Sequence, residues 1–255
     1  MASTSETKVT LHWLDKSRSQ RILWLLEELN VPYEVKTYKR GKDMLAPKEL
    51  RDIHPLGKSP VITVEGPGTT KPIVIAESGF IIEYLCDHFG GDRLIPEKWA
   101  QGKEGLVGGE SEEWLRYRYY MHFSEGSLMP FLVFKLVCDA VRNPPGVPFF
   151  IKPIPRIVAG QIEQQFVEPN LQRTFDFLED QLKNAPGGGP FFCGTKLTAV
   201  DIMMSFPLIA ANTRLPLKDQ YPHLGKYVQE LEKQEGYKRA VAKIEQVDGK
   251  FEASL

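Results

Sequence analysis

Lys8-Val9-Thr10-Leu11-His12-Trp13 is typical of a short β-strand, and Ile22-Leu23-Trp24-Leu25-Leu26-Glu27-Glu28-Leu29 is typical of an amphipathic helix. Between them lies Ser17-Arg18-Ser19-Gln20-Arg21, so the expected order is strand, short loop, helix. A serine of this loop lies at a helix N-terminus, where free backbone N–H groups and the positive end of the helix dipole favour an anion. Serine is also a common N-cap residue, so a purely structural role stays open for Ser17 and for Ser19.

Two further stretches supply groups that can bind a small polar ligand. His54-Pro55-Leu56-Gly57-Lys58-Ser59-Pro60-Val61-Ile62 is a turn that runs into a strand, and a proline there fits a cis peptide, a sheet edge or a rigid turn. With a cis bond, the backbone of Ser59 is free to pair with an extended ligand. In Ile75-Ala76-Glu77-Ser78-Gly79, a strand ends and a helix begins. Glu77 offers a carboxylate to an ammonium group, while Ser78 and the first helical N–H groups offer donors to a carboxylate. Together they predict a site for an α-amino acid head.

The first ninety residues predict a thioredoxin-like domain. Further strands are expected at 33–38, 61–64 and 72–75, and a short helix at 47–53. The last two strands flank a Gly/Pro turn and form a hairpin. Parallel pairing of the first two strands needs the helical crossover that 17–30 supplies.

From Gly91 the composition changes, and no good strand follows. We therefore expect a domain at 7–90, a linker at 91–104 and an all-helical domain at 105–255. Helices are predicted at 114–134 with a kink or stop at Pro130, at 157–184 with a bend near Pro169, and at 224–233 and 237–247. A proline-rich insert is expected at 143–155. Thr198 and Asp201 form a variant capping box that begins a buried helix.

Composition excludes several classes of function. The net charge is −1 over 255 residues, so nucleic-acid binding has no electrostatic support. The three cysteines have no metal-ligand spacing, and their odd number argues against a secreted disulfide framework. Residues 1–7 are polar and predict no signal peptide, and no apolar run is long enough to span a bilayer. We expect a cytoplasmic protein, and peripheral association with a membrane surface stays open.

These motifs together resemble the cytosolic glutathione transferases, and most of all the fungal, yeast-type subgroup. The resemblance covers nearly the whole chain and is carried by 12–27, 54–60, 76–79, 125–128 and 197–202. It implies the fold of that family and, for glutathione (γ-Glu-Cys-Gly), contacts from Glu77 and Ser78 to the γ-glutamyl head. It further implies pairing of the Ser59 backbone with the cysteinyl residue and contact of Lys58 with a carboxylate, most plausibly that of the glycine. Members of the serine type place their serine four residues before an arginine, which favours Ser17 over Ser19 as the group that faces the sulfur.

The resemblance also implies an electrophile pocket between the domains and a detoxifying homodimer. The pocket residues expected are Tyr119, His122, Phe123, Ser127 and Phe131, although these side chains equally suit a helix-bundle core. The mechanism is thiolate activation: a free thiol has a pKa near 8.5, and lowering it by about two units corresponds to about 2.7 kcal/mol. The thiolate then attacks an electrophilic carbon or a peroxide oxygen, without a metal or redox cofactor.

Other functions stay open or are disfavoured. The loop Ser17-Arg18-Ser19-Gln20 has no cysteine, so thiol transfer through a protein mixed disulfide is disfavoured. Disulfide reduction with two bound glutathiones needs no such cysteine and stays open, as does a non-catalytic binding module with the same architecture. A nucleotide-binding domain is excluded, because no glycine-rich phosphate loop follows the first strand.

Overall fold

The structure is a computed structural model that describes residues 7–213, 215 and 217–251. Most of the polar stretch for which the sequence predicts no signal peptide, and the last four residues of the expected helical domain, lie outside the described residues. The boundaries at 7–90, 91–104 and 105–255 stay a prediction. No helix of the described residues is long and apolar enough to cross a membrane.

The N-terminal part folds into a mixed four-stranded sheet with the strand order β2-β1-β3-β4, which confirms the predicted thioredoxin-like layout. β1 pairs in parallel with β2 and antiparallel with β3, and β3 pairs antiparallel with β4. Its elements are β1 Lys8–Leu14, α1 Ser19–Leu29, β2 Tyr33–Tyr38, α2 Glu49–Ile53, β3 Val61–Glu65, β4 Ile73–Ala76 and α3 Ser78–His88.

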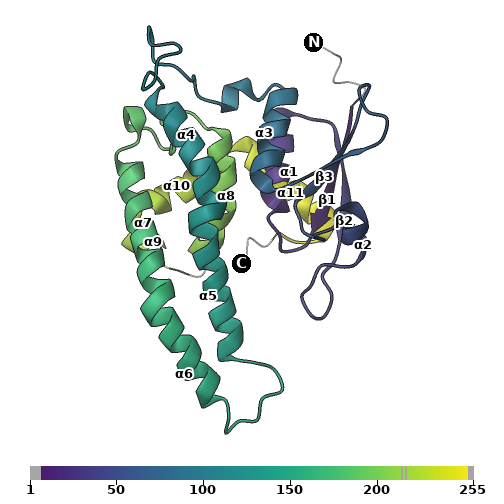
Figure 1. The fold of residues 1–255 in the computed structure, drawn as a ribbon, viewed down its shortest axis with the longest axis vertical. Coiled ribbons are helices and arrows are strands. Elements are labelled where there is room, and N and C mark those ends of the chain that lie inside the picture. Colours follow the sequence, from purple (N-terminus) through teal and green to yellow (C-terminus); the bar gives the residue numbers. More distant parts are fainter. Residues whose placement is uncertain (1–6, 214, 216, 252–255) are drawn as a thin grey trace.

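The sheet has a large core on one face and a small one on the other. Figure 1 shows α1 and α3 between the sheet and the C-terminal helices, and α2 on the outer side of the sheet. Val9, Leu11 and Ile62 are fully buried in the large core. Leu14, Tyr38 and Leu50 form the small cluster beneath α2. Helices thus cover both faces, and the end of β1 leads directly into the turn where the site residues gather.

The C-terminal part is helical, and its two longest predicted helices each consist of two α-helices joined by a π-helical segment. The segments are Ser124–Leu128 and Glu163–Val167. Pro130 and Pro169 lie in the first turns of the helices that follow, immediately after the π-helical segments, where proline lacks the N–H that would continue the helical hydrogen bonding. The helices are α4 Glu112–Phe123, α5 Met129–Arg142, α6 Pro153–Ile162, α7 Glu168–Lys183, α8 Ala199–Asn212, α9 Leu217–Gln220, α10 Pro222–Lys233 and α11 Glu235–Asp248.

The proline-rich insert is shorter than predicted. α6 begins at Pro153, so Pro153 and Pro155 belong to the start of a helix rather than to an irregular segment. Figure 1 shows that α5 and α6 form a long hairpin that extends well beyond the rest of the molecule.

Two helices connect the C-terminal part to the sheet. α8 is buried along nearly its whole length, packs on α1 and α3, and begins at the predicted Thr198–Asp201 capping box. α11 returns to pack along α1. The turn between β1 and α1 is therefore held from both sides by helices that are distant in sequence.

Candidate active site

Ser17 lies in the turn between β1 and α1. The sequence predicted that Ser17 begins the helix, but α1 begins at Ser19 with Arg18 as its N-cap. The Ser17 hydroxyl nevertheless holds this turn, because its Oγ accepts the Ser19 N–H over 3.2 Å. The same Oγ lies 2.6 Å from the Leu14 carbonyl oxygen, so Ser17 also ties the turn back to the end of β1.

Three serine hydroxyls form a hydrogen-bonded chain beneath the site. Ser17 Oγ lies 2.9 Å from Ser19 Oγ, which lies 2.5 Å from Ser59 Oγ. The Ser59 hydroxyl donates to the His12 carbonyl oxygen over 3.0 Å. Each hydroxyl has one proton, so the Ser17 proton goes either to Ser19 or to Leu14. The Ser17 hydroxyl must therefore give up its hydrogen bond to the Leu14 carbonyl oxygen or to Ser19 Oγ before it can donate to a ligand.

The deepest member of this chain is Ser19. Ser19 is fully buried, whereas Ser17 retains a small exposed area. Ser17 lines two cavities that lie on either side of the turn. This exposure makes Ser17, and not Ser19, the hydroxyl that a ligand can reach.

One of these cavities, which we call the cationic cavity, has a volume of about 450 Å³. Every charged side chain that lines it among the described residues is basic, which the sequence did not reveal because these side chains are scattered over the first sixty residues. They are Lys16, Arg18, Arg40, Arg51 and Lys58. Within the described chain, neither the Arg51 nor the Lys58 side chain has an ion-pair partner. The cavity therefore suits an anionic ligand, and its volume falls in the usual range for small-molecule sites.

Gly57 shapes one wall of the cationic cavity. Its φ of +58° lies in the left-handed region that glycine adopts readily. A Cβ at this position would lie 2.7 Å from Arg51 Cγ. The glycine thus allows the Arg51 side chain to pack across the turn that precedes Ser59.

A smaller recess of about 80 Å³, the Glu77 recess, adjoins this cavity. It is lined by all four residues predicted to bind the peptide, Lys58, Ser59, Glu77 and Ser78, and it shares Lys58 and Ser59 with the cationic cavity. Glu77 has a positive φ of 72° immediately before α3, and its side chain is exposed. No described residue pairs with the Glu77 carboxylate, so it can accept an ammonium group.

Arg18 and Glu125 complete the wall between the two spaces. Arg18 lines both the cationic cavity and the Glu77 recess, and Glu125 lines the recess. Glu125 accepts from Arg18 Nη1 over 2.6 Å and from Arg21 Nη1 over 2.5 Å. Arg21 is fully buried, and its ion pair with Glu125 connects α1 to the segment between α4 and α5. Arg18 was not among the residues predicted for the site, although its position next to Ser17 was the available signal.

The five predicted electrophile-pocket residues lie elsewhere: none of them lines the cationic cavity or the Glu77 recess. Tyr119 and Phe123 face α7, where both rings contact Phe177, and Phe131 contacts Phe166. His122 is exposed and Ser127 is half-buried.

The apolar wall of the cationic cavity comes instead from one face of α5 and from α8. Met129, Val133 and Leu136 share that α5 face at helical spacing, and Phe206 lies opposite on α8. The electrophile pocket at Tyr119, His122, Phe123, Ser127 and Phe131 stays a prediction, and the cationic cavity takes its apolar wall from other residues.

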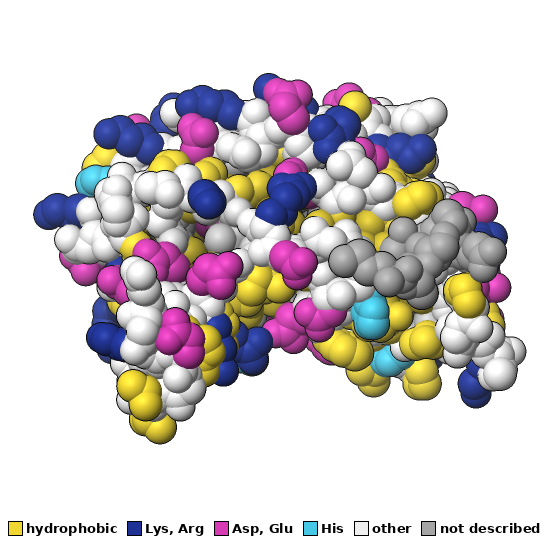
Figure 2. All heavy atoms as spheres, turned by 90° about the horizontal axis from the view of Figure 1, so that it is seen from above, with side chains coloured by type: hydrophobic (Ala, Val, Ile, Leu, Met, Phe, Trp, Pro, Cys, Tyr) yellow, Lys and Arg dark blue, Asp and Glu magenta, His cyan; other side chains and the backbone are white. Residues whose placement is uncertain are grey.

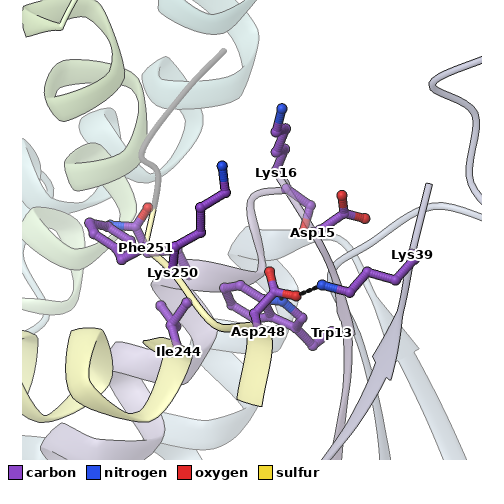
Figure 3. A pocket seen from close by; sticks show the side chains of 10 residues that line it. Trp13, Asp15, Lys16, Lys39, Ile244, Asp248, Lys250 and Phe251 are labelled. Carbon is purple, nitrogen blue, oxygen red and sulfur yellow. Dashed lines mark hydrogen bonds and ion pairs between the residues drawn. The ribbon is translucent and has the colours of Figure 1, made fainter. Parts of the chain in front are cut away.

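Ser17 also lines a third cavity, of about 80 Å³, and Figure 3 shows the residues around it that come from β1 and from the end of α11. The end of α11 closes it: the Asp248 carboxylate accepts from Trp13 Nε1 over 3.3 Å and pairs with Lys39. Hydrogen bonds and ion pairs within the protein, such as those of Asp248, form part of its wall. It shows how the last helix supports the turn that carries Ser17.

His12 supports the opposite side of the serine chain. Its Nδ1 lies 2.9 Å from the Tyr38 hydroxyl and its Nε2 lies 3.3 Å from Thr63 Oγ1. Burial, with a smaller contribution from Lys36, lowers the pKa of His12 to about 4. The imidazole is therefore neutral at pH 7 and serves as a structural partner of Tyr38 and Thr63.

Comparison with known proteins assigns the family. The model of the glutathione S-transferase N-terminal domain matches residues 17–88, and that of the C-terminal domain matches residues 139–235. Glutathione S-transferase 1 of Saccharomyces cerevisiae is 34% identical over 244 residues, which span 95% of this chain and 98% of that protein. This chain belongs to the glutathione S-transferase family. The predictions of the yeast-type family and of a glutathione transferase enzyme are thereby confirmed.

Solved structures agree with this glutathione S-transferase fold. A glutathione S-transferase from Actinobacillus pleuropneumoniae has a TM-score of 0.69 and 27% identity, and the match covers 96% of this chain and 95% of the other. The glutathione transferase URE2P8 of Phanerochaete chrysosporium, solved with oxidized glutathione, has a TM-score of 0.66 and 18% identity. That match covers 98% of this chain and all of the other, and at this identity it supports only the fold.

Proposed function

We propose that this enzyme binds glutathione across the cationic cavity and the Glu77 recess, and that it ionises the glutathione thiol beside Ser17. The proposal rests on one observation: the site offers positive charges for the negative groups of glutathione and a negative charge for its ammonium group. Glutathione has two carboxylates and a thiol that becomes negative, and it has one ammonium group. The cationic cavity is lined only by basic charged residues, and the adjoining recess offers the unpaired carboxylate of Glu77.

The two ends of glutathione then have distinct partners. Glu77 takes the ammonium group of the γ-glutamyl head, and Ser78 with the first N–H groups of α3 takes its carboxylate. The backbone of Ser59 pairs with the cysteinyl residue. Lys58 takes the glycine carboxylate, with Arg51 alongside it in the cavity wall.

The thiol lies between these ends, beside the turn that precedes α1. A thiolate there gains a hydrogen bond when the Ser17 hydroxyl turns away from the Leu14 carbonyl oxygen. The Arg18 guanidinium and the N-terminus of α1 add positive potential. The thiolate sulfur attacks an electrophilic carbon and forms a C–S bond, and the displaced electron pair leaves with the leaving group or is protonated after addition. These steps use no metal and no redox cofactor.

The electrophile occupies the apolar side of the cationic cavity. Met129, Val133 and Leu136 supply that side, so a substrate with an aryl or alkyl body fits it. An organic peroxide can meet the same thiolate. The sulfur then attacks the outer peroxide oxygen, an alcohol leaves, and a second glutathione reduces the sulfenic acid to a disulfide and water.

Calorimetry with glutathione tests the binding site. Glu77→Ala and Ser78→Ala are each expected to weaken binding by about 1–3 kcal/mol, the usual cost of losing a charged or buried hydrogen bond. Glu83→Ala is the matched control, because Glu83 also lies on α3 but pairs with Arg118 outside the recess. Unchanged affinity in both site variants, with the fold intact, would contradict this placement.

Turnover with an aryl halide, an organic peroxide and a mixed disulfide separates the activities. Conjugation of the aryl halide is expected. Activity confined to the mixed disulfide would favour a glutathione-dependent reductase that works without a catalytic cysteine, and binding without turnover of any of the three would favour a non-catalytic module. Cys86, Cys138 and Cys193 are all buried, so none of them is placed to form a protein mixed disulfide.

A further inference from the structure

The tip of the α5–α6 hairpin exposes far more apolar surface than a helix connection needs. We define the hairpin tip as residues 141–158. Phe149 and Phe150 are 82% and 68% exposed, and Ile154 and Ile157 are 62% and 65% exposed. Figure 1 shows that the tip is the most distant end of the molecule, so no other described segment folds back over it.

The two phenylalanines contact each other, with their ring centroids 5.6 Å apart at an interplanar angle of 90°. Prolines flank this pair at 148 and 153, and Pro144 and Pro145 precede it. Because proline fixes φ and donates no backbone hydrogen bond, the connection cannot continue either helix. The rings of Phe149 and Phe150 are therefore exposed on the loop between α5 and α6.

The charges of the hairpin tip are all of one sign. Between Asp139 and Glu163 the charged residues are Arg142, Lys152 and Arg156. Arg142 is paired with Glu163, whereas Lys152 and Arg156 are exposed and have no acidic partner in the described part of the chain. Figure 2 looks onto the opposite end of the molecule, where Lys and Arg side chains alternate with Asp and Glu side chains. The tip differs from that end of the molecule, because its exposed aromatic rings lie near cations without acidic partners in the described residues.

An anionic bilayer surface matches both properties of the tip. Aromatic and aliphatic side chains enter the boundary between headgroups and acyl chains, while basic side chains remain at the anionic headgroups. A symmetric contact between two tips is less suitable, because it would bring Lys152 and Arg156 of one copy against the same cations of the other. No helix of the described residues spans a membrane, so the contact is peripheral.

We propose that the hairpin tip docks this protein on bilayers that contain anionic lipid. Phe149 and Phe150 enter the interface, and Lys152 and Arg156 contact the headgroups. The tip lies outside the residues that line the cationic cavity and the Glu77 recess, so this docking does not depend on the glutathione chemistry proposed above.

The test is co-sedimentation of the full-length protein with vesicles of phosphatidylcholine and phosphatidylserine, and with vesicles of phosphatidylcholine alone. Binding is expected with the anionic vesicles and is expected to weaken as salt is added. The double variant Phe149→Ser, Phe150→Ser should reduce the partition coefficient at least about tenfold. The double variant Lys152→Glu, Arg156→Glu should reduce it by a similar factor and remove the preference for anionic lipid.

A matched control removes apolar surface at the other end of the molecule. Leu106 and Val107, in the loop before α4, are 59% and 105% exposed, so Leu106→Ser with Val107→Ser changes a comparable surface. This control should bind vesicles as the wild type does. Circular dichroism and turnover with a water-soluble aryl halide show whether each variant is folded, and the tip variants should retain both.

Three outcomes would overturn the proposal. The first is no binding of the wild-type protein to anionic vesicles, and the second is equal loss of binding in the tip and control variants. The third is a lower molar mass of the Phe149→Ser, Phe150→Ser protein by light scattering without lipid, because the tip would then be a contact between copies of the chain. Vesicle binding is measured without glutathione, so its failure is distinguishable from failure of the proposed function.

Discussion

Arg21 Nη1 lies 2.5 Å from Glu125 Oε1, and this ion pair connects α1 of the sheet domain to the π-helical segment between α4 and α5. The other Glu125 oxygen accepts from Arg18, the residue next to Ser17. Burial lowers the pKa of Arg21 and the neighbouring Glu125 carboxylate opposes that shift, so Glu125 offsets part of the cost of burying the guanidinium charge.

Glu125→Ala is therefore expected to destabilise the protein strongly. It leaves the fully buried Arg21 cation without its counter-charge, which typically costs about 3–5 kcal/mol. Urea unfolding measures the loss. Glu83→Ala is the control, because it breaks the half-exposed pair with Arg118, and such pairs contribute about 0–1 kcal/mol. Equal losses in the two variants would show that Arg21 does not need Glu125.

The stability of the protein should fall as the pH drops from about 6.5 to about 4, in part because of His12. Burial lowers the folded-state pKa of His12 from 6.5 to about 4. Between these values the unfolded chain binds a proton that the folded chain does not, so acid favours unfolding. His12→Gln keeps a polar group between Tyr38 and Thr63 but removes the titration. Urea unfolding at several pH values should show a flatter profile for this variant, and parallel profiles would contradict the assignment.

The capping box of α8 gives a second stability prediction. The fully buried Asp201 carboxylate accepts from the Thr198 N–H and hydroxyl, each over 2.8 Å, and from the Tyr227 hydroxyl over 3.0 Å. Asp201→Asn places an NH₂ donor against one or more of these donors. Each buried donor left unpaired should cost about 1–3 kcal/mol in urea unfolding.

Tyr227→Phe is the milder control for this site. It removes one donor and leaves Asp201 with its Thr198 contacts, so the expected cost is about 1 kcal/mol. Burial raises the pKa of Asp201 to about 6, so both variants are compared well above that pH, where the carboxylate is ionised. An Asp201→Asn protein as stable as Tyr227→Phe would contradict the prediction.

The predicted homodimer rests on an exposed apolar face of the sheet domain. Ile73 and Val74 of β4 and Phe80 of α3 are 43%, 42% and 56% exposed, an unusual density for a surface without a partner. Light scattering at micromolar concentration should give twice the chain mass of 29.0 kDa. Phe80→Glu should shift the mass toward the monomer, and a monomeric wild-type protein would contradict the prediction.

The sequence predicted the strands and the start of α3 well because these depend on local signals. Alternating apolar residues and the Glu77-Ser78 helix start act within a few residues of the chain, and both are found where they were expected. The helix breaks were only partly predictable. Prolines at 130 and 169 mark the interruptions, but a π-helical segment depends on packing between helices that a single sequence does not show.

The apolar side of the cationic cavity was not predictable for the same reason. Tyr119, Phe123 and Phe131 have the composition of a substrate pocket, but their helical phase turns them toward α7 and toward Phe166. Met129, Val133 and Leu136 reach the cavity because the π-helical segment at Ser124–Leu128 rotates α5 relative to α4. The basic lining was equally hidden, since Arg40 and Arg51 meet Lys58 only after the chain folds.

Ser17→Ala tests the catalytic hydroxyl. If the Ser17 hydroxyl stabilises the bound thiolate, its removal should raise the pKa of the glutathione thiol and reduce turnover at neutral pH by about 10- to 1000-fold, as for the loss of one preorganised donor. Binding should change little, because the contacts of Glu77, Ser78 and Ser59 remain. The loss is partial, since Arg18 and the N-terminus of α1 also remain. Thiolate absorbance against pH, with steady-state rates, measures both effects.

Ser19→Ala is the matched control, because it removes a hydroxyl from the same chain without opening a route to the ligand. Ser19 is fully buried, and its Oγ lies 2.5 Å from Ser59 Oγ. Loss of this hydroxyl should lower the free energy of unfolding and leave the pKa of the glutathione thiol nearly unchanged. A shift with Ser19→Ala and none with Ser17→Ala would exchange the two roles. If neither variant shifts the thiol pKa, the thiolate is held by Arg18 or by backbone N–H groups. Arg18→Ala then decides between these two, because it removes the cation and leaves the backbone of the turn in place.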